Sequence, residues 1–81
     1  MSEGLKQDIS IGENLKQLRK NAHLTQKEAS AKLEVMGLPI SPDILAKMEQ
    51  GRYSIRISVL LALKQLYQVN SFDEFFANLH L

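Results

Sequence analysis

The residues with the clearest chemical capacity lie just past the middle of the chain. Arg52, Tyr53, Ser54 and Arg56 place two guanidinium groups, a phenol and a hydroxyl within five residues. Groups of this kind donate hydrogen bonds to phosphate oxygens. Lys47, a few residues earlier, adds an ammonium group that can donate to phosphate or to a guanine edge. An ordinary solvated loop has the same composition, so the meaning of these residues depends on the elements that hold them.

Patterns for catalysis or metal binding do not stand out. The chain has no cysteine, which excludes thiolate metal sites and disulfide scaffolds. The two histidines, His23 and His80, are far apart in sequence, and no Ser/His/Asp arrangement or phosphate-binding glycine loop is present. We therefore expect no enzyme activity, no metal and no cofactor.

Two capped helices precede the donor-rich stretch. Thr25 followed three residues later by Glu28 is a capping box, which satisfies free N–H groups at a helix start. Ser41 before Pro42 marks a second start, because serine accepts such N–H groups and proline at the first helical position has none. Gly51 suits the end of that second helix. Two short helices around a turn are typical of a helix-turn-helix, whose second helix enters the major groove of DNA.

The motifs around these helices resemble the Cro/C1-type (XRE-like) DNA-binding domains. The similarity depends on Arg19, on residues 25–28 (TQKE) and on residues 44–51 (ILAKMEQG), and it extends over roughly residues 11–76. It implies an all-α, five-helix, lambda-repressor-like domain in which the second and third helices form the helix-turn-helix.

The resemblance also implies roles for individual residues. Arg19 and Glu49 would form an internal ion pair that ties the first helix to the third. The other implied residues contact DNA: Gln26 and Lys27 at the start of the second helix, Ser41, Pro42, Asp43, Ile44 and Lys47 as base-reading positions, and Arg52, Tyr53 and Arg56 in the loop that meets the phosphate backbone. Gln26 has the alternative of being a plain solvated residue. We place Asp43, Ile44 and Lys47 on the outward face of the third helix; Asp43 can only accept, for example from cytosine N4.

The chain divides into an expected flexible arm at residues 1–9 and one domain at residues 10–81. The expected helices cover residues 10–23, 25–36, 41–50, 57–67 and 71–79. Ser10 with Glu13, and Ser71 with Glu74, are the capping boxes of the first and last helix. The fourth helix is apolar nearly all round, so we expect it to be buried on more than one side.

Among the features that depart from the family pattern, two lie at the turns on either side of the second helix. His23 occupies a position where a glycine usually follows the first helix, and histidine adopts the left-handed conformation at some cost. The turn at residues 34–40 is longer than usual. We expect Val35, Leu38 and Ile40 to pack beneath it.

The last expected helix is crowded with apolar side chains: Phe72, Phe75, Phe76, Leu79 and Leu81. This is more than one side of a small domain easily buries, and exposed apolar patches usually mark an interface. We therefore expect a homodimer contact here. The alternative is that the cluster only completes the core.

Composition and charge leave two classes of function. No signal peptide and no apolar run long enough for a membrane span is present, so we expect a cytoplasmic protein without a membrane partner. The favoured hypothesis is a homodimeric transcriptional regulator that binds an operator in double-stranded DNA and takes no small-molecule ligand, similar to short phage-type repressors or the controllers of restriction–modification systems. The rival is an antitoxin-like protein-interaction module, supported by the net charge of only +1 and by Pro42 and Asp43.

Overall fold

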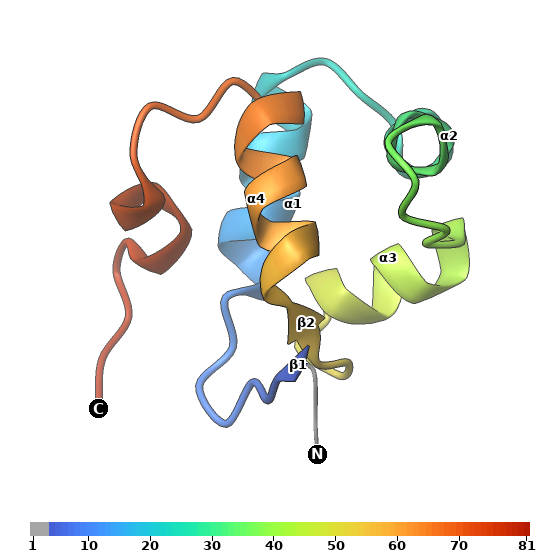
Figure 1. Ribbon diagram of the computed structural model, residues 1–81. Helices are drawn as coiled ribbons and strands as arrows, with labels where there is room; N and C mark the ends of the chain where they lie inside the picture. The colour runs from blue at the N-terminus through green and yellow to red at the C-terminus, as the bar shows by residue number, and fades with distance from the viewer. Residues whose placement is uncertain (1–3) are drawn as a thin grey trace.

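Helices dominate the structure, a computed structural model that describes residues 4–81 (Figure 1). The elements in chain order are β1 (Gly4–Leu5), α1 (Gly12–Asn21), α2 (Gln26–Val35), α3 (Pro42–Glu49), β2 (Ile55–Arg56), α4 (Ile57–Leu66) and the 3-10 helix η1 (Phe72–Phe76). The expected five-helix, all-α fold is therefore corrected to four α-helices, a 3-10 segment and one short strand pair. None of the described helices is long and apolar enough to cross a membrane.

The core forms where α3 packs against α1 and α2, and where α2 packs against α4. Leu15, Leu33, Leu45 and Leu63, one from each α-helix, are almost completely buried. Leu45 and Met48 point inward from α3, as their spacing predicts. The recognition helix of the predicted motif is thus held on its inner face by both preceding helices.

Local capping chemistry sets two of the helix starts. Thr25 Oγ1 accepts a hydrogen bond from Glu28 N at 3.1 Å, and Glu28 Oε1 accepts one from Thr25 N at 2.9 Å, which confirms the capping box. Ser41 Oγ accepts from Ile44 N at 3.2 Å. All three bonds join residues three apart, so they depend only on the local turn of the chain into a helix.

The start of α1 differs from the predicted capping box. Ile11 precedes the helix and no side chain caps it in the predicted way. Gln7 Oε1 accepts instead from Ile11 N at 3.0 Å, and Ser10 Oγ accepts from Gly12 N at 2.9 Å. The N–H groups at this helix start are satisfied partly by the preceding segment, and the predicted capping box of Ser10 and Glu13 is not formed.

The turns on either side of α2 agree only in part with the prediction made from the sequence. His23, with φ 60°, takes the left-handed conformation after α1 that a glycine usually takes. Leu38 and Ile40 pack against the core beneath the longer turn. Val35 was expected there too, but it is 89% exposed because it ends α2 on the outward side.

The N-terminal segment is paired from its first described residue. β1 lies antiparallel to β2, with Gly4 opposite Arg56 and Leu5 opposite Ile55. Residues 4–9 of the expected arm therefore contact the body of the domain, whereas residues 1–3 of that arm lie outside the described residues.

The C-terminal segment is shorter than the expected helix. Ser71 and Glu74 form the predicted capping box, but the 3-10 turn ends at Phe76 and the chain becomes extended at Ala77. Asn14 Nδ2 donates to the carbonyl oxygens of Phe75 and Ala77, at 2.9 Å each. These carbonyls are satisfied by α1, so they do not need a continuing helix.

Candidate nucleic-acid interface

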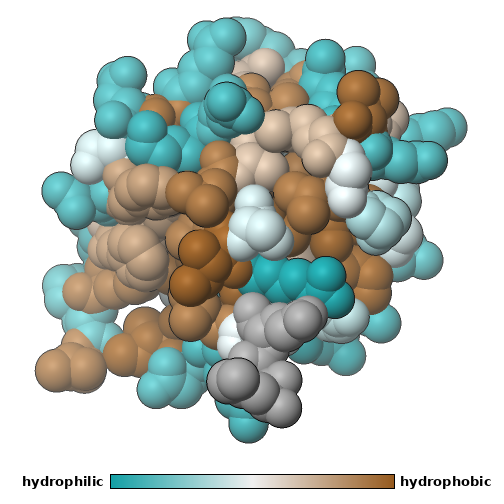
Figure 2. Space-filling view, viewed as in Figure 1, coloured by the Kyte–Doolittle hydropathy of each residue, from teal (hydrophilic) through white to brown (hydrophobic). Residues whose placement is uncertain are grey.

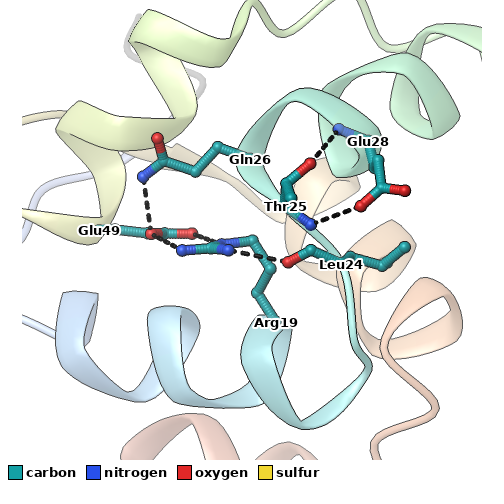
Figure 3. A network of polar contacts seen from close by, with 6 residues as sticks. All are labelled: Arg19, Leu24, Thr25, Gln26, Glu28 and Glu49. Carbon is teal, nitrogen blue, oxygen red and sulfur yellow. Dashed lines mark hydrogen bonds and ion pairs between the residues drawn. The ribbon is translucent and has the colours of Figure 1, made fainter.

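One carboxylate joins the three helices of the candidate site (Figure 3). Glu49 comes from the end of α3, Arg19 from α1 and Gln26 from the start of α2. Arg19 Nε lies 2.7 Å from Glu49 Oε2, and Arg19 Nη2 lies 3.1 Å from Oε1. Gln26 Nε2 donates to Glu49 Oε1 at 3.0 Å, and Arg19 Nη1 donates to the carbonyl of Leu24 at 2.8 Å.

This network fixes the direction of α3 relative to α1 and α2. The side chains of Arg19 and Glu49 are only 8% and 3% exposed. The hydrogen bond to Glu49 raises the pKa of Arg19, so the guanidinium stays charged. A bidentate pair of this kind is both strong and directional. Arg19 and Glu49 therefore lie together inside the domain.

Gln26 has a different contact from the one expected for it. Its amide N–H points to Glu49 and the side chain is half-buried. A phosphate contact through the same N–H would have to break this bond. Lys27, the next residue, is exposed on the first turn of α2 and is the freer donor there.

The end of α3 lies very close to the beginning of α1. A side-chain carbon at Gly12 would collide with the backbone carbonyl of Glu49. Gly51, with φ 74°, lets the chain leave α3 in the left-handed conformation. Ser30 donates from its hydroxyl to the carbonyl of Ile40, which ties α2 to the turn before α3. No local pattern in the sequence marks Gly12 or Ser30 for these contacts.

The expected base-reading residues do not all face outward. Asp43 and Lys47 are exposed on the outer face of α3. Ile44, which we expected to point into a groove, is half-buried and packs against the core. The hydroxyl of Ser41 accepts the capping bond, and Pro42 supplies the first helical residue without an N–H. The outer face of α3 thus offers a cation and a carboxylate as its charged groups.

The loop after α3 brings several predicted donors to the surface. Arg52 is exposed and its Nη1 donates to Gln50 Oε1 at 3.3 Å. Tyr53 is 42% exposed. Ile44, Tyr53 and Arg56 all line one hollow of about 410 Å³ between this loop and the turn before α3. The structure therefore collects the loop donors beside α3.

Gln7 is a positioning residue that the sequence analysis missed. Its Nε2 donates to the carbonyl of Met48 at 3.1 Å and to that of Tyr53 at 2.7 Å. The partners lie 41 and 46 residues away, so no short-range spacing could indicate them. Gln7 links the N-terminal segment to the end of α3 and to the donor loop.

The apolar cluster expected at a dimer contact is divided. Phe75 is fully buried in the core, so it is not part of the surface. Phe72 faces α4, where it shares a hollow with Met36 and Leu61, and its ring stands 5.3 Å from Lys64 Nζ. Phe76, Leu79 and Leu81 lie on another hollow, beside the N-terminal segment. In a 3-10 turn of about three residues, Phe72 and Phe75 lie on the same side, with ring centroids 6.1 Å apart, whereas Phe76 is turned away from both.

Comparison with known families decides the class of the domain. A profile described as a helix-turn-helix domain matches residues 10–74, which is most of the chain. The chain belongs to the helix-turn-helix domain family. Within this helix-turn-helix domain, the match contains α1 to α4, the ion-pair network and the donor loop. Comparisons with curated proteins and with solved structures find no significant match.

The helix-turn-helix match is consistent with the Cro/C1-type resemblance and indicates a DNA-binding regulator. The chemistry of the site agrees with this class, because it consists of donors on a helix and a loop. Among residues 4–81, no group of three or more acidic or histidine side chains lies close enough to hold a metal ion.

Proposed function

We propose that this helix-turn-helix domain is a sequence-specific transcriptional regulator that binds an operator in double-stranded DNA as a homodimer. The observation that carries the proposal is the arrangement around α3. The helix is locked from behind by Arg19, Gln26 and Glu49, while Lys47 on its outer face and Arg52 after it are exposed. A rigid helix with exposed donors on one side is what readout in the major groove requires.

The donors divide between two kinds of contact. Lys47, in the middle of α3, is placed to reach base edges, and Asp43 can accept from cytosine N4. Arg52, Tyr53 and Arg56, with Lys27 on α2, are proposed to contact phosphates, which positions the domain without reading sequence. The carboxylate of Asp43 is repelled by phosphates, so it favours a site where cytosine N4 donates a hydrogen bond to it.

A homodimer is proposed through the apolar side chains of Phe76, Leu79 and Leu81. Two recognition helices must reach successive major grooves, about 34 Å apart on one face of the DNA. A two-fold contact between identical surfaces sets that distance. The burial of Phe75 and the separate position of Phe72 restrict this contact to part of the originally expected cluster.

Binding to a random-sequence duplex over a series of salt concentrations tests the DNA contact. We expect Arg52→Ala to weaken binding to all sequences and to reduce the salt slope by about one unit. Lys47→Ala should instead relax the preference among sequences selected from a random pool. Lys64→Ala is the matched control, because Lys64 lies against the Phe72 ring on α4 and carries the same charge.

Normal binding by both Arg52→Ala and Lys47→Ala at moderate salt would place the nucleic acid elsewhere.

The second candidate is a protein-interaction module of the antitoxin-like kind. Ile57 and Leu61 favour it, because they are 56% and 54% exposed on a helix that we expected to be buried on more than one side. A parent protein that fails to bind duplex DNA even at low salt supports this second function.

A further inference from the structure

An apolar groove separates the N-terminal segment from the C-terminal residues. Leu5 and Ile9 line it on one side and Phe76 and Leu81 on the other, and it holds about 380 Å³. Leu5, Ile9 and Phe76 are 48%, 38% and 47% exposed. Figure 2 shows hydrophobic surface gathered on the left and lower left of the view, where the C-terminal segment lies. We call this feature the arm groove.

The N-terminal segment that forms one side of the arm groove also supports the donor loop. Lys6, Gln7 and Asp8 line the arm groove and also a second hollow, of about 340 Å³, which they share with Arg52 and Tyr53. Gln7, which belongs to this segment, donates hydrogen bonds to the carbonyls of Met48 and Tyr53. One short stretch of chain therefore contacts the groove, the end of α3 and the loop proposed to meet phosphate.

We propose that a second copy of this chain occupies the arm groove, and that the N-terminal segment couples this contact to DNA binding. The proposal rests on the homodimer of the proposed function and adds Leu5 and Ile9 to its interface. The charges of the groove favour a second copy as the occupant, because it carries both Lys6 and Asp8. In a two-fold contact, a residue that meets a second residue of the other copy is matched by the reciprocal pair, so Lys6 of each copy can face Asp8 of the other.

The coupling follows from the hydrogen bonds of Gln7. A second copy packed against Leu5 and Ile9 restricts the segment that carries Gln7, and Gln7 restricts the donor loop through Tyr53. The loop is then already ordered when DNA arrives, so binding loses less conformational entropy. By linkage, DNA must strengthen the dimer by the same factor that the dimer strengthens DNA binding.

A duplex long enough for only one subunit separates this coupling from simple bivalency. We would measure the affinity per subunit for a random duplex of about 10 base pairs, which spans a single recognition helix. The variants are Phe76→Asp, which is expected to be a monomer, Gln7→Glu, and the double variant. Glu at position 7 keeps acceptors for Ile11 N but cannot donate to Met48 or Tyr53.

We expect the parent dimer to bind the short duplex at least about fivefold more tightly per subunit than Phe76→Asp does. In the Gln7→Glu background this ratio should fall to about one, which is the signature of a coupling interaction in a double-mutant cycle. Gln65→Glu is the charge control, because Gln65 is exposed on α4 and changes charge equally. Thermal unfolding shows that each variant is folded, and sedimentation shows that Gln7→Glu is still a dimer, because Gln7 also lines the arm groove. Gln7→Met replaces Gln7→Glu if either condition fails.

The outcomes distinguish the inference from the proposed function. A parent dimer whose short-duplex affinity equals that of Phe76→Asp overturns the coupling, although the dimer can still bind a long duplex more tightly through bivalency. A Phe76→Asp variant that sediments as a dimer, or a parent that sediments as a monomer, overturns the assignment of the arm groove. A parent that does not bind a duplex of about 30 base pairs overturns the proposed function itself.

Discussion

Replacing Arg19 by methionine should strongly destabilise the domain. The variant keeps most of the apolar stem but leaves the Glu49 carboxylate, 3% exposed, without its cation. Breaking one side of a buried ion pair costs about 3–5 kcal/mol. A domain of 81 residues has a total stability of roughly 4–12 kcal/mol. The change therefore removes about a quarter or more of the free energy of unfolding.

Thermal and urea unfolding followed by circular dichroism measure this loss. At about 4–8 °C per kcal/mol for a domain of this size, the midpoint should fall by about 12–40 °C. Arg52→Met is the matched control, because Arg52 is exposed and its replacement should change stability by less than about 0.5 kcal/mol. In the cold, where Arg19→Met is still folded, its loss of binding free energy for duplex DNA should be smaller than its loss of stability.

A second variant tests the physical cause. Arg19→Met combined with Glu49→Met removes both charges, and apolar replacement of a whole buried pair is often neutral or stabilising. We expect the double variant to recover most of the lost stability. An Arg19→Met protein that melts like the parent but no longer binds DNA would refute the reasoning and make Arg19 a nucleic-acid contact.

Two further predictions concern single groups. The hydroxyl of Tyr67 is buried without a hydrogen-bond partner among the described residues, and burial raises the pKa of Tyr67. Tyr67→Phe should therefore leave the thermal midpoint unchanged or raise it. A fall of more than about 1 kcal/mol in stability would mean that the hydroxyl is hydrogen-bonded in solution. The hydrogen bond from the Thr25 backbone lowers the pKa of Glu28 below its ordinary 4.5. The capping box therefore contributes stability above about pH 4.5 that is lost as the pH falls through the lower, folded-state pKa. Urea midpoints at neutral and acid pH should show a smaller acid loss for Glu28→Gln than for the parent, and equal losses would contradict the cap's ionic character.

The starts of α2, α3 and η1 were predictable from sequence, whereas the start of α1 was not. Thr25 with Glu28, and Ser71 with Glu74, form their capping boxes as predicted, because each bond joins residues only two or three apart. The inward face of α3 followed from spacing for the same reason, since a helix brings Leu45 and Met48 to one side regardless of what lies beside it. The class of the domain followed from these local patterns together with the resemblance.

The packing of the helices decided the remaining features. The C-terminal phenylalanines were predicted to share one surface, but Asn14 holds the carbonyls of Phe75 and Ala77 and the segment winds as a 3-10 turn. Phe75 therefore enters the core, while Phe72 and Phe76 face different hollows. Their hydrophobicity indicated that burial of these side chains is favourable, but not which neighbours would cover them.

Gln26 and Gln7 show most directly which contacts the sequence alone leaves open. Each carries an amide that sequence alone permits to face water, phosphate or another residue. The tertiary structure directs Gln26 to Glu49, 23 residues away, and Gln7 to Met48 and Tyr53, 41 and 46 residues away. The sequence by itself determined the contacts that act within one helical turn, because covalent spacing brings those groups together. Contacts between distant residues depend on how the helices pack, so only the tertiary structure decided that Gln26 belongs to the ion-pair network and that the N-terminal segment supports the end of α3.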